Sequence, residues 1–262
     1  MGGAAKTASR VDVDPRMRSR RIAVRRDQGK RRLRRLTVAL AAVAVVVAAV
    51  VATQTPLLDV DRVRIGGVGH TAAADVRRVA GIDPGDPMVG VDLGRAAGRV
   101  EDLPWIATAR VVRRWPGTVE IRVTEREPLA MVGVAEGRVA LVDGDGRVLD
   151  VTGQPPAGLP ELTAVSSRGI AEGDELGRDP RDALAILRAL RERLPGVVAS
   201  VASDLDATLA AGGEIRFGST DDLDDKIVAV ETVLADVDTD CLELLDVRVP
   251  GSPALTRHQR CS

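Results

Sequence analysis

The sequence predicts an α+β protein with one membrane-spanning helix near its N-terminus and two further domains behind that helix. Three observations indicate this. A run of 17 uncharged residues, 36–52, follows a strongly basic segment. Residues 59–127 then show the order strand, helix, helix, strand, strand. Residues 128–251 mix short strands with two amphipathic helices, which is typical of a β-rich domain with helices packed on its sheet.

The uncharged run is expected to cross a membrane as a helix. At about 1.5 Å per residue it spans roughly 26 Å, slightly less than a ~30 Å hydrocarbon core. The residues up to Leu58 supply the missing length, so the helix is assigned to 36–58, with Pro56 near its outer end. A cleaved signal peptide is the alternative, and the basic segment of 35 residues ahead of the run is too long for one.

The uncharged run separates a basic segment from an acidic one. The tail 1–35 carries thirteen basic and three acidic side chains, whereas 53–262 carries 24 basic and 35 acidic ones. Because Lys and Arg beside a membrane segment stay on the cytoplasmic side, we expect a single-pass type II protein of the cell membrane, with its N-terminus inside. The basic tail has no aromatic residue to stack on bases, so we expect it to contact membrane lipid and not nucleic acid.

The first block after the membrane segment begins with a strand and a helix. Apolar and polar residues alternate over 60–65, which predicts a strand. Thr71 is expected to cap a helix that runs to Ala80, and Gly81 provides its stop signal.

A second helix and two strands complete this block. The helix is expected over 92–103 and ends at Pro104, whose ring cannot continue the helical hydrogen bonds. Two antiparallel strands follow, joined by a tight turn at 115–118. Trp105 and Trp115 lie at the two ends of the first strand. Such rings more often cover a core than bind a ligand, so both are expected to cover the core.

The second block, 128–251, is expected to form one twisted sheet with helices on one side. Glycine-containing turns separate its first short strands. Its later elements are strands at 197–201, 214–218 and 242–249 and helices at 179–194 and 220–234, the last capped by Ser219 or Thr220. The tail 252–262 is expected to be flexible.

Several motifs, in order along the chain, resemble those of one family. They are Leu103–Ile106, the arginine-rich strand that ends at Trp115–Pro116, Glu120–Ala130, the hairpin of Ala140–Asp143 and Gly146–Leu149, and Leu159–Leu162. The first block resembles a POTRA domain, and the whole set resembles the FtsQ/DivIB family of bacterial cell-division proteins. The resemblance implies an extracytoplasmic POTRA domain over 59–127, a following β domain over 128–251, and no enzymatic activity.

The resemblance also implies a partner-binding strand near the end of the second block. In this family the strand and loop at this place bind FtsB/DivIC, and the family's D-x-R motif corresponds to Asp246–Arg248, so that Arg248 would pair with a partner carboxylate. The candidate residues are Leu244, Leu245, Asp246, Val247, Arg248 and Val249. From the residues alone, this segment is either an edge strand that another chain extends or a closing strand of the core.

The sequence singles out no catalytic, metal-binding or cofactor-binding site. His70 and His258 lack partners at metal-ligand spacing. The segment Asp143–Gly146 is expected to be a hairpin turn and not a calcium loop, since the rest of a calcium-binding pattern is missing. The acidic run 221–225 is expected to lie in the first turn of a helix.

The two cysteines, Cys241 and Cys261, are too few for a disulfide framework, and no disulfide is assigned to them.

We therefore expect a non-catalytic scaffold of the divisome at the division septum. The resemblance implies FtsB/DivIC-like and FtsL-like coiled-coil partners and a connection to the septal peptidoglycan synthase complex. The alternative is a membrane-anchored POTRA chaperone for exported polypeptides, for which tandem copies of the first domain would be expected. An anchored enzyme would need an acid–base pair that the sequence does not single out.

Overall fold

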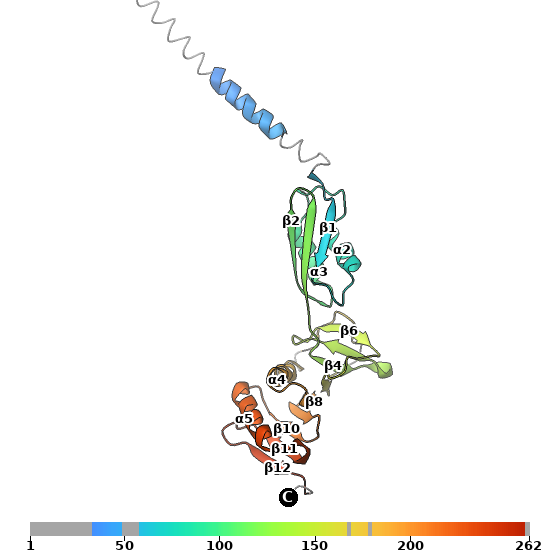
Figure 1. Ribbon diagram of the computed structural model, residues 1–262, viewed down its shortest axis with the longest axis vertical. Helices are drawn as coiled ribbons and strands as arrows, with labels where there is room; N and C mark the ends of the chain where they lie inside the picture. Colours follow the sequence, from blue (N-terminus) through green and yellow to red (C-terminus); the bar gives the residue numbers. More distant parts are fainter. Residues whose placement is uncertain (1–32, 49–57, 167–168, 178–179, 260–262) are drawn as a thin grey trace, which may run out of the picture.

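The computed structural model describes residues 33–48, 58–166, 169–177 and 180–259. A helix over 33–48 comes first, followed by one α+β domain and then a second one (Figure 1). Within these described ranges, no helix is both long and apolar enough to cross a membrane. The predicted membrane segment 36–58 is helical as far as residue 48, and its part 49–57 lies outside the described residues.

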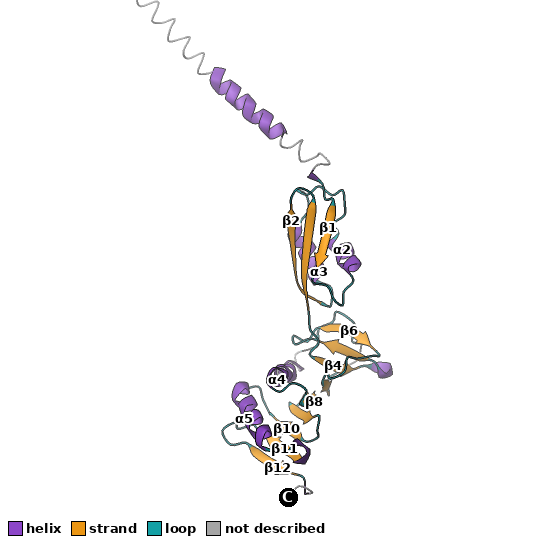
Figure 2. Cartoon of the chain, viewed as in Figure 1, coloured by secondary structure: helices purple, strands orange, loops and turns teal. Residues whose placement is uncertain are grey.

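The first domain has the predicted order of strand, helix, helix, strand, strand (Figure 2). Its elements are β1 (Arg62–Gly66), α2 (Ala73–Ala80), α3 (Leu93–Glu101), β2 (Ile106–Arg114) and β3 (Thr118–Glu125). The order in the sheet is β1-β3-β2, with β1 parallel and β2 antiparallel to β3. Both helices pack on one face of this sheet around an aliphatic core. Among the described residues, no helix covers the opposite face (Figure 1).

Local signals explain most helix ends in this domain. Gly81 ends α2 in the left-handed conformation (φ 59°), and Asp92 caps α3 by accepting a hydrogen bond from a backbone amide of its first turn. The expectation that Thr71 caps α2 is wrong, because Ala72 occupies the cap position and makes no side-chain bond. The backbone amide of Thr71 instead donates to the Glu125 carboxylate at 2.8 Å, which ties the start of α2 to the end of β3.

The two tryptophans differ in their surroundings. Trp105 is half-buried, and its ring stacks on the His70 ring with centroids 4.2 Å apart. Trp115 lies in the turn between β2 and β3 and is 56% exposed. The expectation that Trp115 covers the core is therefore wrong, because the turn places it past the last core-facing residues of β2.

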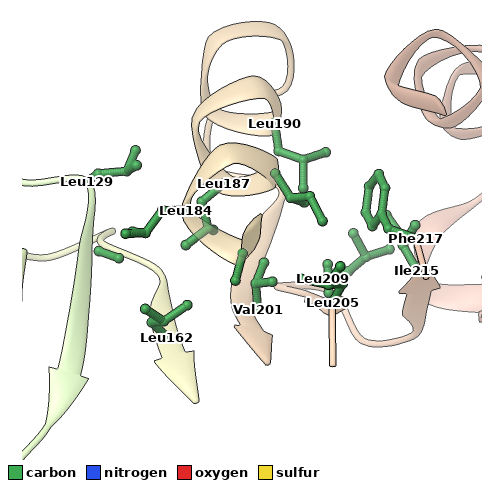
Figure 3. Close-up of a cluster of buried hydrophobic side chains, with 14 of the residues drawn as sticks. Leu129, Leu162, Leu184, Leu187, Leu190, Val201, Leu205, Leu209, Ile215 and Phe217 are labelled. Atoms are coloured by element: carbon green, nitrogen blue, oxygen red, sulfur yellow. The ribbon is translucent and has the colours of Figure 1, made fainter. Parts of the chain in front are cut away.

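The described part of the second domain contains one nine-stranded sheet, two α-helices and two short 3-10 helices, Ala135–Gly137 and Thr239–Cys241. Its strands are β4 (Ala130–Gly133), β5 (Val139–Val142), β6 (Val148–Thr152), β7 (Glu161–Thr163), β8 (Val198–Ala202), β9 (Asp206–Leu209), β10 (Glu214–Arg216), β11 (Leu242–Asp246) and β12 (Ala254–Arg257). The order in the sheet is β12-β11-β10-β9-β8-β7-β4-β5-β6. Helices α4 (Pro180–Arg193) and α5 (Leu223–Asp236) contact each other and pack on the sheet around leucine, valine and isoleucine side chains and Phe217 (Figure 3).

The C-terminal part of this sheet differs from expectation. The last predicted strand, 242–249, ends at Asp246. The tail expected to be flexible from residue 252 contains β12, which pairs antiparallel with β11. Strand β9, which was not predicted, connects β8 to β10. Cys241, just ahead of β11, is disulfide-bonded, and the only other cysteine of the sequence, Cys261, lies outside the described residues.

The start of α5 also differs from expectation. Neither Ser219 nor Thr220 caps this helix; Asp222 holds the cap position in a left-handed conformation without a side-chain cap bond. The carboxylates of Asp224 and Asp225 lie in the first turn, as predicted. The Ser219 carbonyl and hydroxyl instead accept hydrogen bonds from the buried Lys226 ammonium, at 3.0 and 3.2 Å.

Two arginines connect the domains. The Nη1 atom of Arg126 lies 2.6 Å from Oδ2 of Asp143, and Nη2 of Arg147 donates to the Asp102 carbonyl at 2.8 Å. The Asp143 side chain is buried and also accepts from the backbone amides of Asp145 and Arg147, at 2.9 and 2.8 Å. The two bonds from the backbone amides to Asp143 stabilise the turn between β5 and β6, so the prediction of a hairpin turn at 143–146 is confirmed.

Candidate protein-binding edge of the second sheet

Strand β12 forms one edge of the nine-stranded sheet. Its inner side pairs with β11, with Leu244 opposite Thr256, Leu245 opposite Leu255 and Asp246 opposite Ala254. No described strand lies on its outer side. All four residues of β12 are exposed. Because half of the backbone groups of an edge strand lack a ladder partner, this edge can accept a further strand from another chain.

The six predicted partner-binding residues lie one strand further in than expected. Of the two alternatives for 242–249, an edge strand or a closing strand of the core, the edge strand is wrong, because β12 covers β11. Leu245 and Val247 are fully buried in the core. Leu244 and Asp246 are half-buried, while Arg248 and Val249 are exposed in the connection to β12. The structure thus leaves four of the six side chains accessible.

Arg248 and Asp246 form a close ion pair on this connection. The Arg248 Nε atom lies 3.0 Å from both carboxylate oxygens, and Nη2 lies 2.7 Å from Oδ2. The Arg248 backbone amide also donates to Oδ1, at 3.0 Å. The hydrogen bond from the Arg248 side chain lowers the pKa of Asp246, and the same bond raises the pKa of Arg248. Both groups therefore stay charged across the physiological range of pH.

This pair extends a row of alternating charges across three strands. Arg216 of β10 is in register with both Asp206 of β9 and Asp246 of β11. The Arg216 Nε atom lies 3.3 Å from Asp206 Oδ2. The order Asp206, Arg216, Asp246, Arg248 therefore alternates in sign toward the sheet edge. Since the neighbouring Ile215 and Leu245 are buried and side chains alternate along a strand, the row lies on the face turned away from the core.

Exposed apolar side chains gather around the same edge. In the part of the second domain that the structure describes, three large hydrophobic residues are exposed: Val228 of α5 at 46%, Val249 at 64% and Leu255 of β12 at 36%. An open groove of about 450 Å³ runs between α5 and the β11–β12 connection. Its lining consists of Asp225, Val228, Ala229, Thr232, Val233, Pro250, Gly251 and Pro253. Apolar surface beside unpaired backbone is suited to binding an extended polypeptide with its flanking side chains.

Neither β12 nor Val228 was among the residues predicted for this site. A usable signal was present, because Pro250 to Pro253 form a turn-like segment between two strand-compatible runs. Elsewhere in the described ranges, no group of three or more His, Cys, Asp or Glu side chains could hold a metal ion. The chemistry that this edge offers is recognition of another polypeptide.

Sequence comparisons agree with this architecture. Residues 58–126 match the profile described as POTRA domain, FtsQ-type, and residues 130–248 match the profile described as cell division protein FtsQ/DivIB, C-terminal. The two matched segments meet where Arg126 links the domains.

Relatives from several bacteria share most of the chain. A protein of Corynebacterium glutamicum named cell division protein FtsQ is 30% identical over 207 residues, which is 76% of this chain and 89% of that protein. A protein of the same name from Streptomyces collinus is 33% identical over 239 residues, covering 86% of this chain and 89% of that protein. With both domains matched in order and relatives aligned over most of their length, this chain belongs to the FtsQ/DivIB family of bacterial cell-division proteins.

Proposed function

We propose that this protein is a membrane-anchored, non-catalytic scaffold of the bacterial divisome, which binds another division protein along β12. The observation that carries the proposal is that the three exposed large hydrophobic residues in the described part of the second domain lie on β12, on the connection before it and beside the adjoining groove, while no described strand pairs with the outer side of β12. Edge strands of this kind attract other chains, and a partner strand is one means of covering them. The family of the chain supplies the biological setting, which is cell division.

The anchor in this proposal is the segment 36–58, with the basic tail 1–35 in the cytoplasm. Support comes from the uncharged run at 36–52 and the helix over 33–48. The disulfide bond of Cys241 also supports an extracytoplasmic position for the second domain, because disulfides persist mainly in oxidising compartments. The chain would then be a single-pass type II protein of the cell membrane at the division septum.

The proposed partners are FtsB/DivIC-like and FtsL-like single-pass coiled-coil proteins, which would connect the chain to the septal peptidoglycan synthase complex. A partner strand would pair with the outer side of Ala254–Arg257, and its apolar side chains would enter the groove beside α5. Of the residues 244–249, the accessible Asp246, Arg248 and Val249 would border that strand. Because Arg248 is already paired with Asp246, a partner carboxylate would join an existing ion pair.

Affinity capture with the tagged full chain from detergent-solubilised membranes tests this function. Small single-pass coiled-coil proteins should be captured, and Val228→Lys and Leu255→Asp should abolish their capture, because each places a charge on the apolar border of β12. Ala235→Lys is the matched control, since Ala235 is exposed on the same helix but does not line the groove. Equal capture by all variants would place the interface elsewhere. Capture of many unrelated unfolded exported polypeptides would favour the chaperone alternative.

A further inference from the structure

Charge is unevenly distributed over the first domain. Residues 58–127 contain eleven arginines, no lysine and eleven carboxylate side chains, so the domain as a whole is neutral. The sheet face opposite the helices nevertheless carries five arginines and one glutamate. The arginines are Arg62 and Arg64 of β1, Arg110 and Arg114 of β2, and Arg122 of β3, all exposed. We call this surface the arginine face.

The single acid on the arginine face is already neutralised. Glu120 accepts a hydrogen bond from Nε of Arg114 at 2.9 Å and another from Nε of Arg122 at 2.6 Å. The bond from the Arg114 side chain is the main cause of a lowered pKa at Glu120. The other three arginines of the face have no ion-pair partner among the described residues. The face therefore presents unpaired positive charge to a ligand.

Exposed apolar side chains lie at one end of this domain. In its described part, the exposed large hydrophobic residues are Trp115 at 56% and Val89 at 54%. Both belong to the end where the chain enters the domain: the Asp61 amide donates to the Gly117 carbonyl at 2.7 Å, and Arg113 at the end of β2 donates to the Val89 carbonyl at 3.5 Å. Tryptophan with one exposed apolar side is favoured at the boundary between lipid and water.

The end of the domain that carries Trp115 and Val89 is joined to the helix over 33–48 by a short segment, so the domain must stay near that helix. The nine residues 49–57 span at most about 30 Å when fully extended. An end-on approach to a membrane would bring Asp59 and Asp61 toward the headgroups. A domain lying on its arginine face instead brings the arginines to the headgroups, with Trp115 at the rim of the contact. Because a charge acts over only about 8 Å at physiological ionic strength, the face-on arrangement is the one in which all five arginines contribute.

We infer that the arginine face of the first domain rests on the anionic headgroups of the membrane in which the chain is anchored, with Trp115 inserted at the interface. The inference rests on the proposed anchor at 36–58. It assigns the first domain a binding site for anionic lipid, formed by arginines whose guanidinium groups can donate two hydrogen bonds to phosphate oxygens. Its consequence is a fixed tilt of the domain, which sets the direction in which the second domain extends from the membrane.

The test uses the full chain in nanodiscs of phosphatidylcholine alone or mixed with phosphatidylglycerol. The sequence contains two tryptophans, so Trp105→Phe leaves Trp115 as the only indole. With brominated acyl chains, we expect strong quenching of Trp115 fluorescence in discs that contain phosphatidylglycerol and loss of that quenching in phosphatidylcholine alone. High salt should reverse the quenching, because it screens the headgroup charge. In the Trp115→Phe chain, the remaining Trp105 signal should not be quenched.

Two triple variants separate the arginine face from overall charge. Arg62→Gln with Arg64→Gln and Arg110→Gln should abolish the quenching, while removal of three exposed arginines from the helical side, Arg77, Arg78 and Arg95, by the same change should preserve it. Quenching that is equal in both lipids, or that survives the first triple variant, would overturn the inference while leaving the anchor intact. A chain that does not incorporate into nanodiscs at all would overturn the anchor and the inference together.

Discussion

Arg248 holds Asp246, two residues earlier in the chain, in a forked ion pair with Nη2 to Oδ2 at 2.7 Å and Nε to Oδ1 at 3.0 Å. The pair lies where β11 ends and the chain turns toward β12. It therefore stabilises the loop between β11 and the edge strand β12, and it also places charge at the proposed interface.

Replacement of Arg248 by alanine should raise the pKa of Asp246. The side-chain hydrogen bond from Arg248 is the largest cause of the lowered pKa, and the variant lacks that bond. A carboxyl titration followed by NMR measures the change directly. The fold should be retained, because Arg248 is exposed and contributes nothing to the core. An Asp246 carboxyl that titrates as in the unaltered protein would contradict the ion pair.

Gly218→Ala should disturb the Asp246–Arg248 ion pair, because Gly218 is distant from Arg248 in the sequence but contacts it in the fold. Gly218 has φ +69°, and a Cβ there would lie 2.8 Å from Cγ and 2.9 Å from Cδ of Arg248. An alanine with left-handed backbone angles destabilises the folded state by about 1–2 kcal/mol, whatever its surroundings. Gly137→Ala is the control, since its φ of +71° is nearly the same and nothing lies within 4 Å. In urea unfolding, Gly218→Ala should lose more stability than the control, and equal losses would mean that the Arg248 stem moves aside freely.

The first domain should lose stability in acid through Glu125. Burial alone would raise the pKa of this carboxyl, but hydrogen bonds from the backbone amides of Thr71, His70 and Gly69 lower it from 4.5 to about 2. The unfolded chain therefore binds more protons than the folded one between these values. The contribution is fully present above pH 4.5 and is lost as the pH falls toward 2.

Glu125→Gln should remove this pH dependence and destabilise the domain at neutral pH by about 1–2 kcal/mol, because a neutral side-chain amide is a weaker acceptor for these backbone amides. Tryptophan fluorescence during urea unfolding of the full chain reports on this domain alone, since Trp105 and Trp115 both lie in it. The nearby exposed Glu127→Gln should leave the curve unchanged. If the free energy of unfolding of Glu125→Gln still falls between pH 4.5 and 2, other carboxylates are the cause of the acid sensitivity.

Lys226→Met should destabilise the second domain by about 1–3 kcal/mol. The Lys226 side chain is 3% exposed, and its Nζ donates to the carbonyls of Phe217 and Ser219, each at 3.0 Å, and to the Ser219 hydroxyl at 3.2 Å. Methionine fits the space but cannot donate, so the Ser219 carbonyl loses the ammonium and the Phe217 carbonyl keeps only the Ser219 backbone amide, at 2.8 Å. Thermal unfolding followed by circular dichroism measures the loss. Ser219→Ala removes one of the three Lys226 acceptors and the exposed bonds between the Ser219 hydroxyl and Asp221, and should cost less than about 1 kcal/mol.

The sequence predicted the first domain well because its boundaries are set by local chemistry. Gly81 ends a helix in a conformation that glycine adopts readily, and Asp92 caps the next one. The turn at 115–118 joins two strands whose alternation is visible in the residues. Signals of this kind act within a few residues, so they can be interpreted without knowledge of the tertiary structure.

The second domain was harder to predict because its late elements depend on distant pairing. All four residues of β12 are exposed, so hydrophobic alternation does not mark the strand, and it exists only by pairing with β11. The predicted set 244–249 lies in and after β11, which β12 covers, so the edge of the sheet is one strand further along the chain. Lys226 was also missed as a buried residue, since its three acceptors come from a turn that the sequence does not place beside it.

Strand β12 follows every other described strand of its sheet in the chain, so a ribosome makes it after all of them. A nascent chain that has not yet passed residue 254 has β11 exposed where the finished protein has β12. The proposed docking on β12 would therefore require a finished domain, because an incomplete chain lacks the strand that a partner strand would pair with. If the proposed interface is correct, the position of this one short strand makes completion of the second domain a condition for assembly.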